Sequence, residues 1–125
     1  MKEYQIIVGE NTRHEIVLTA MECGRDLAVV ICGGSRHHVG AVALGSGCLP
    51  DGSALKYSAT VSSICALDHK DDAVARKAAA LLADQIHGAV SVSVGIHVDQ
   101  ATGEDIRLLG EAALEACQKL IRLLS

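Results

Sequence analysis

The sequence has almost no aromatic residues. Tyr4 and Tyr57 are the two aromatic side chains among 125 residues, and there is no Phe or Trp. Proteins that bind single-stranded nucleic acid stack the bases on aromatic side chains, so this class has no platform here. Positive charge is also scarce, because 11 Lys and Arg stand against 15 Asp and Glu, for a formal net charge of -4. With no basic block to neutralise successive phosphates, duplex nucleic acid is excluded as a partner too.

Long apolar runs and paired cysteines are missing as well. No stretch approaches the roughly 18 uninterrupted apolar residues of a membrane-spanning helix. The opening MKEYQIIVGE lacks the positive segment, apolar run and cleavage site of a secretory signal. The five cysteines contain no CxxC pair, and their odd number argues against a disulfide framework. We therefore expect a cytoplasmic protein with reduced thiols and no membrane partner.

What is present fits a single domain over residues 1–125. Hydrophobic residues make up 50% of the chain and charged residues 21%, and no linker, repeat or low-complexity segment divides it. In the first half, apolar or alternating segments are separated by turn signals, which predicts five strands. These strands cover residues 2–8, 14–21, 26–32, 38–47 and 56–65.

The hydrophobic period changes in the second half. Residues 71–88 have helical spacing, residues 90–98 alternate strictly, and a second helix follows, with Thr102 as its N-cap and Asp105 three residues later. The order βββββαβα predicts an α+β fold. We expect a two-layer sandwich, with a mixed, mostly antiparallel sheet of about six strands and both helices on one face.

This topology predicts that three histidines share one edge of the sheet. The strand, helix and returning strand form a crossover, so 56–65 and 90–98 should run parallel. His69 after the first and His97 near the end of the second then lie at the carboxyl edge, where open α/β sheets bind ligands. The strand 38–47 should run antiparallel to 56–65, which brings His38 to the same edge.

The same edge carries features that suit a phosphate. Only one of His37 and His38 can point into the site, since successive strand residues face opposite sides, and we favour His38 within the strand. Gly40 has no Cβ and lets a ligand approach closely. Both helices begin here and present unpaired amides and a positive dipole end. Together with Arg36 and Lys70, these amides suit a phosphate group.

A histidine-bound metal is an alternative use of this edge. His38, His69 and His97 come from separate elements, and three imidazoles with one open position are a common way to hold catalytic zinc or copper. Such a site would make the chain a metal enzyme acting on a small anionic substrate. The sequence contains no Ser-His-Asp elbow, GxGxxG, GxxxxGK[ST] or HExxH, so the common enzyme classes have no motif here.

The sheet is also expected to leave a face for another subunit. We expect the small residues Val39, Ala41, Ala43 and Gly45 to meet a second sheet together with the serines of 90–98. This predicts a homodimer or a higher homo-oligomer.

Three segments resemble a known family. The run GGSRHHVGAV from Gly33 to Val42, the run HKDD that begins at His69 and opens a helix, and GIHVD from Gly95 to Asp99 follow in this order. They resemble the prenylated-flavin chaperone-like proteins, the small D subunits that accompany UbiD-type non-oxidative hydroxyarylic acid decarboxylases such as gallate decarboxylase. The resemblance spans roughly residues 25 to 110.

The resemblance implies an accessory role rather than catalysis. Such a protein would bind prenylated FMN, or FMN, during its oxidative maturation or its delivery to the large decarboxylase subunit. The flavin phosphate would lie on the helix amides, and the histidines would contact the ring system or a divalent metal. A third alternative is a structural subunit whose polar edge binds a partner chain. The residues implied in cofactor binding are Arg36, His38, Gly40, His69, Lys70 and His97.

Overall fold

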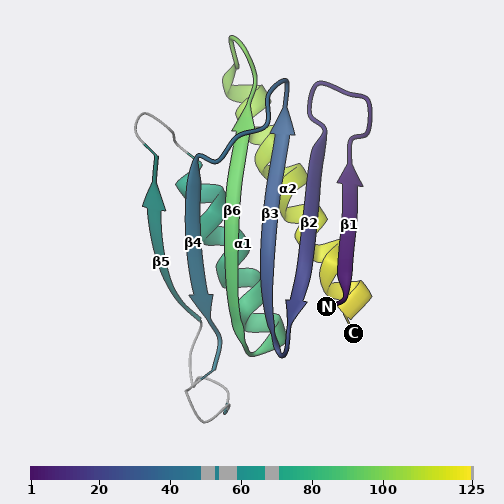
Figure 1. Cartoon of the computed structure of the whole chain (residues 1–125). Coiled ribbons are helices and arrows are strands. Elements are labelled where there is room, and N and C mark those ends of the chain that lie inside the picture. The colour runs from purple at the N-terminus through teal and green to yellow at the C-terminus, as the bar shows by residue number, and fades with distance from the viewer. Residues whose placement is uncertain (49–52, 54–58, 67–70, 125) are drawn as a thin grey trace.

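The computed structural model describes residues 1–48, 53, 59–66 and 71–124. Within them the strands form one six-stranded sheet, and both helices cover the same face of it (Figure 1). The predicted α+β, two-layer fold is confirmed. The elements are β1 (Glu3–Val8), β2 (Ile16–Cys23), β3 (Asp26–Gly34), β4 (Ala41–Ser46), β5 (Thr60–Cys65), α1 (Asp72–Ile86), β6 (Ala89–His97) and α2 (Gly103–Leu124).

The strand order is β1-β2-β3-β6-β4-β5. β6 pairs parallel with β3 and antiparallel with β4, and β4 pairs antiparallel with β5. β5 and β6 therefore run in the same direction, as predicted, but β4 lies between them. A crossover through a helix makes the two strands that it joins parallel, but it does not decide which strand becomes the neighbour of the returning one. The sequence pattern therefore did not reveal the β3–β6 pair.

The core lies between the sheet and the two helices. Ile16, Leu18, Ile31 and Val92 are fully buried on the helix-facing side of the strands. Helix α1 presents a run of small buried residues to the sheet, including Ala79 and Ala83. These small side chains allow the helix to approach the sheet closely. The core is therefore packed without large aromatic side chains.

The expectation that the small residues of β4 and the serines of β6 share one face is wrong. Ala41 and Ala43 are buried, and a Cβ at Gly45 would lie 2.6 Å from the Ala79 carbonyl oxygen, so these residues face α1. Ser91 and Ser93 alternate with the buried valines of β6 and lie on the opposite side. The small residues of β4 make room for the helix and not for a second subunit.

Helix α2 begins with the predicted cap. The Asp105 amide donates to Thr102 Oγ1 over 3.1 Å, and the Thr102 amide donates to Asp105 Oδ2 over 3.0 Å. This reciprocal pair is a capping box in which Asp takes the place of the usual Glu. Among the described residues, no helix is both long and apolar enough to span a membrane.

Removing the capping hydroxyl is expected to destabilise the fold measurably. Thr102→Ala leaves the Asp105 amide without its acceptor and should lower the free energy of unfolding by about 1 kcal/mol. Urea denaturation followed by circular dichroism measures this change. Thr102→Ser retains the hydroxyl and should stay close to the parent protein, whereas an equal loss in both variants would show that the hydroxyl does not cap the helix.

Candidate functional site

Two of the predicted histidines lie together at one end of the sheet. His97 is the last residue of β6, and His38 lies in the connection from β3 to β4, which crosses β6 near its end (Figure 1). The ring centroids are 6.3 Å apart, with an angle of 77° between the ring planes. The Gly40 amide donates to the Val94 carbonyl over 2.8 Å and anchors the crossing. At Gly95 a Cβ would overlap the His38 carbonyl, so only glycine lets the connection pass over the strand.

The prediction that His38 belongs to strand 38–47 is wrong, because β4 begins at Ala41. Residues 35–40 instead form the connection from β3 that crosses β6. The side chain of His38 is nevertheless only 17% exposed, and both of its ring nitrogens are buried. His37 is exposed. His38, rather than His37, thus lies beside His97.

Asp71 links His38 to the start of helix α1. The residue stands at the N-cap, yet its side chain makes no capping hydrogen bond. Its Oδ2 lies 3.8 Å from His38 Nε2. A Cβ at Gly40 would overlap this carboxylate, so the missing side chain of Gly40 makes room for Asp71 rather than for a ligand. The Asp71 carboxylate therefore lies within ion-pair distance of His38 and makes no side-chain capping hydrogen bond at α1.

His97 is positioned by both its backbone and its ring. Its carbonyl accepts hydrogen bonds from the Ser35 amide over 2.8 Å and from Ser35 Oγ over 3.2 Å. Gly34 has a φ of 77°, and a Cβ there would overlap the same carbonyl. On the ring, Nε2 lies 2.8 Å from Asp99 Oδ1. The side chain is 33% exposed, so the ring remains accessible to a ligand.

Two of the residues predicted to bind the cofactor cannot be located relative to His38 and His97. His69 and Lys70 lie outside the described residues. Arg36 is exposed in the same connection that carries His38. The structure thus brings His38, Gly40 and His97 to one edge with Arg36 nearby, and the complete cofactor set stays a prediction.

The metal alternative gains no support from the described part of the chain. No group of three or more His, Cys, Asp or Glu side chains there is arranged to hold a metal ion. Of the three predicted ligands, His38 and His97 are close together, and His69 is outside the described residues.

The sequence was compared with known protein families. Residues 10–125 match the prenylated flavin chaperone LpdD-like domain. The chain belongs to this family. The match confirms the resemblance in the three segments and extends it beyond residues 25 to 110. No curated protein matches the sequence.

The fold of this LpdD-like chain also occurs in a solved structure of a chaperone complex for yeast 20S proteasome assembly. The two chains superpose with a TM-score of 0.60 over 98% of each, at 14% sequence identity. At this identity the likeness concerns the fold alone.

The two helix N-termini of the LpdD-like chain differ in what they can offer an anion. At α2, Asp105 receives hydrogen bonds from Arg13, from the Thr102 amide and from His14, and these hold the pKa of its carboxyl well below the usual range. An anionic side chain therefore already occupies the position where a phosphate was expected. At α1, Asp71 stands at the N-cap and its side chain makes no capping hydrogen bond.

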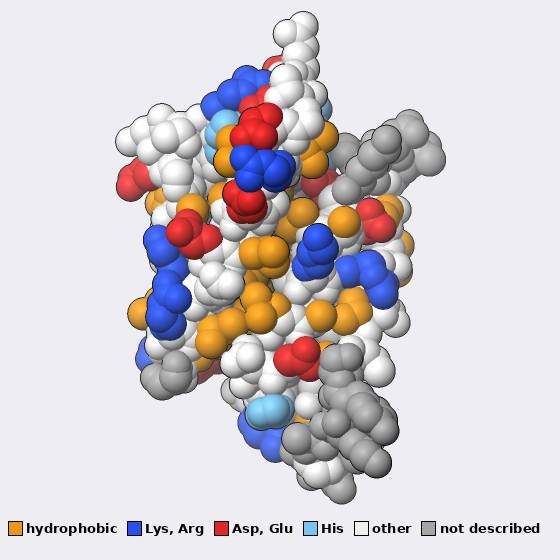
Figure 2. All heavy atoms as spheres, turned by 180° about the vertical axis from the view of Figure 1, so that it is seen from behind, with side chains coloured by type: hydrophobic (Ala, Val, Ile, Leu, Met, Phe, Trp, Pro, Cys, Tyr) orange, Lys and Arg blue, Asp and Glu red, His pale blue; other side chains and the backbone are white. Residues whose placement is uncertain are grey.

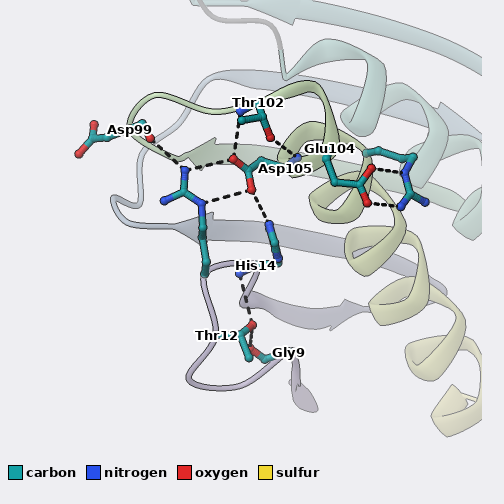
Figure 3. A network of polar contacts seen from close by, with 9 residues as sticks. Gly9, Thr12, His14, Asp99, Thr102, Glu104 and Asp105 are labelled. Carbon is teal, nitrogen blue, oxygen red and sulfur yellow. Dashed lines mark hydrogen bonds and ion pairs between the residues drawn. The ribbon is translucent and has the colours of Figure 1, made fainter.

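No sequence pattern predicted that Arg13 and His14 contact Asp105; Figure 3 shows the His14 ring pointing toward the Asp105 carboxylate. Arg13 Nε lies 3.2 Å from Asp105 Oδ1, and His14 Nε2 lies 2.7 Å from the same oxygen. Arg13 also donates to the Asp99 carbonyl over 3.1 Å. These residues come from the turn between β1 and β2, 92 positions before Asp105 in the case of Arg13, so no local motif pairs them. The network ties that turn to α2 and to the loop that follows His97.

A groove of about 350 Å³ lies between the two helices, away from the sheet. Figure 2 shows hydrophobic side chains gathered along this side of the molecule. Val74, Lys77 and Ile106 line the groove together with Arg107, which forms ion pairs with Glu104 and Glu111. Among the described residues, none of Arg36, His38, Gly40 and His97 lines this groove.

Proposed function

We propose that this chain binds prenylated FMN at the edge formed by His38 and His97 and assists its maturation or its delivery to a UbiD-type hydroxyarylic acid decarboxylase. The observation that carries the proposal is the pair of imidazoles 6.3 Å apart beside the α1 N-terminus, in a member of the prenylated flavin chaperone family. On this proposal the chain is a cytoplasmic accessory protein, and the decarboxylase performs the chemistry.

The residues present fit a flavin mononucleotide in their donor chemistry. The first-turn amides of α1 suit its phosphate, because the Asp71 side chain points toward His38 instead of capping them. Asp71 and Asp72 bring negative charge to the same place, so the phosphate needs a cation, and Arg36 and Lys70 are the candidates. The cofactor supplies the decarboxylation chemistry in the partner enzyme.

His38 and His97 are the groups proposed to contact the ring system. Each imidazole can donate or accept a hydrogen bond, which matches the carbonyl oxygens and ring nitrogens of a flavin. Val39 lies between His38 and β4 in the chain. Its side chain is 61% exposed and offers an aliphatic surface for the flavin ring. An acidic side chain accompanies each imidazole, because Asp99 Oδ1 lies 2.8 Å from His97 Nε2 and Asp71 Oδ2 lies 3.8 Å from His38 Nε2.

The proposal predicts a flavin band in the purified protein. The full chain is co-expressed with a flavin prenyltransferase, purified without oxygen and desalted, and its visible absorbance is recorded before and after air is admitted. We expect a flavin spectrum that survives desalting and changes on oxidation. A colourless protein containing a stoichiometric metal by elemental analysis would instead favour the metal enzyme, and a colourless protein without metal would favour a structural subunit.

A further inference from the structure

The Arg13 guanidinium joins the loop after β6 to the start of helix α2. Its Nη2 donates to the Asp99 carbonyl over 3.1 Å and to Asp105 Oδ2 over 3.1 Å (Figure 3). Arg13 comes from the turn between β1 and β2, so a part of the chain far away in sequence reaches this loop. The Asp99 carboxylate in turn lies 2.8 Å from His97 Nε2. A continuous series of contacts thus leads from Arg13 through Asp99 to the His97 ring.

Asp99 lies in a loop that supplies little to hold it. Its side chain is 83% exposed, so packing does not fix the carboxylate that faces His97. The next residue, Gln100, has a φ of 53°, a left-handed conformation that a residue with a side chain adopts only at a cost in free energy. Such a backbone persists when its surroundings hold it. The hydrogen bond from Arg13 to the Asp99 carbonyl, directly before Gln100, is a contact of this kind.

Arg13 is itself held at both ends. Its backbone lies in a turn in which the amide and the hydroxyl of Thr12 both donate to the Gly9 carbonyl, over 3.0 Å and 2.6 Å. Its guanidinium makes two hydrogen bonds to Asp105, a residue only 7% exposed. A planar guanidinium has its donors in fixed directions, whereas an ammonium on a flexible stem does not. Arg13 therefore has the rigidity needed to fix the Asp99 backbone.

We propose that Arg13 is a positioning residue for the proposed flavin site and acts on His97 through Asp99. By fixing the Asp99 carbonyl, Arg13 keeps the Asp99 carboxylate beside His97 Nε2 and restricts the rotation of the imidazole. A ring that is ordered in advance loses less conformational freedom when a ligand binds. The role of His97 toward a flavin rests on the proposed function, so the ring is measured both without ligand and with flavin.

The ligand-free chain tests whether Arg13 orders the His97 ring. In Arg13→Ala, ¹³C relaxation of the His97 imidazole should show a lower order parameter than in the parent chain. Thr102→Ala is the matched control, because it weakens the same end of α2 and leaves the Asp99 contacts in place. It should keep the order of the ring. An unchanged ring in Arg13→Ala, or an equal loss of order in both variants, would overturn the inference.

Flavin dissociation tests whether this order matters for binding. The chain is loaded with prenylated FMN by co-expression with a flavin prenyltransferase without oxygen, and the flavin lost on repeated desalting gives a dissociation rate. We expect Arg13→Ala to raise this rate about fivefold, the effect of one exposed hydrogen bond. In an Asp99→Ala background the same change should have no further effect, because its path to His97 is already broken. Equal effects of Arg13→Ala in both backgrounds would show that Arg13 does not act through Asp99.

The two measurements separate failure of this inference from failure of the proposed function. A parent chain that retains no flavin contradicts the proposed function, and the order of the ring still decides whether Arg13 positions His97. A parent chain that retains flavin, with dissociation unchanged in Arg13→Ala, overturns the inference alone. If Arg13→Ala does not fold, Arg13→Lys carries the same expectations, because its ammonium keeps a positive charge beside Asp105 and lacks the geometry that reaches both acceptors.

Discussion

Replacing both His38 and His97 by alanine is expected to abolish flavin retention while leaving the fold intact. A hydrogen bond to a charged or polar ligand group contributes about 1.5 kcal/mol, or roughly a tenfold change in affinity. Loss of both imidazoles should therefore weaken binding about a hundredfold, enough for the flavin to be lost on desalting. Visible absorbance after desalting measures retention, and circular dichroism checks the fold.

His37→Ala is the matched control for the histidine pair. His37 is exposed and adjoins His38 in sequence, so the variant removes an imidazole from the same connection without touching the pair. We expect it to retain flavin as the parent chain does. Loss of flavin in His37→Ala, combined with retention in the double variant, would transfer the binding role to His37.

Replacing Asp105 is expected to destabilise the protein more than any single change at its partners. The residue is 7% exposed and joins Arg13, His14 and Thr102 in one network. Asp105→Ala removes the carboxylate that accepts hydrogen bonds from the Arg13 guanidinium and from the Thr102 amide. We expect a larger fall in the midpoint of thermal unfolding than Thr102→Ala produces. Glu111→Gln, which removes one exposed ion pair with Arg107, should change the midpoint little.

The same network makes an acid-dependent contribution to stability. The folded-state pKa of Asp105 lies well below its usual range, mainly through the Arg13 hydrogen bond, whereas the unfolded chain has a pKa of about 3.9. The unfolded state therefore binds more protons, and this contribution is present above the unfolded pKa and lost as the pH falls through the folded one. In Asp105→Asn, urea denaturation at neutral pH and near pH 3 should show a smaller acid loss than in the parent chain. Equal losses would assign the acid sensitivity to other carboxylates.

The local patterns of the sequence were sufficient for the elements and for the α2 cap. Strict alternation in residues 90–98 corresponds to β6, and the helical period in 71–88 corresponds to α1, which ends at Ile86 before His87 in the left-handed conformation. Thr102 and Asp105 are three residues apart and meet within one helical turn. Such features depend on neighbours in sequence, which is why a pattern alone predicts them.

The resemblance in three short segments was likewise sufficient for the family, which the match over residues 10–125 confirms. It could not show how the histidines are arranged. His38 was expected on a strand, and it instead lies in a crossing connection that only Gly95 permits, where it approaches His97. The path of a connection depends on which strands are neighbours, and β6 between β3 and β4 is a tertiary choice.

Long-range packing also decided which surfaces are covered. The sequence alone determined that β4 carries a small face and that β6 carries a row of serines, because side chains alternate along any strand. Only the tertiary structure placed Ala41 and Ala43 under α1 and left Ser91 and Ser93 on the opposite face of the sheet. It also joined Arg13 and His14 to Asp105 across the molecule. Alternation gives each strand two faces. The position of the helices decides which of the two faces is buried. That position depends on the burial of apolar side chains over the whole sheet.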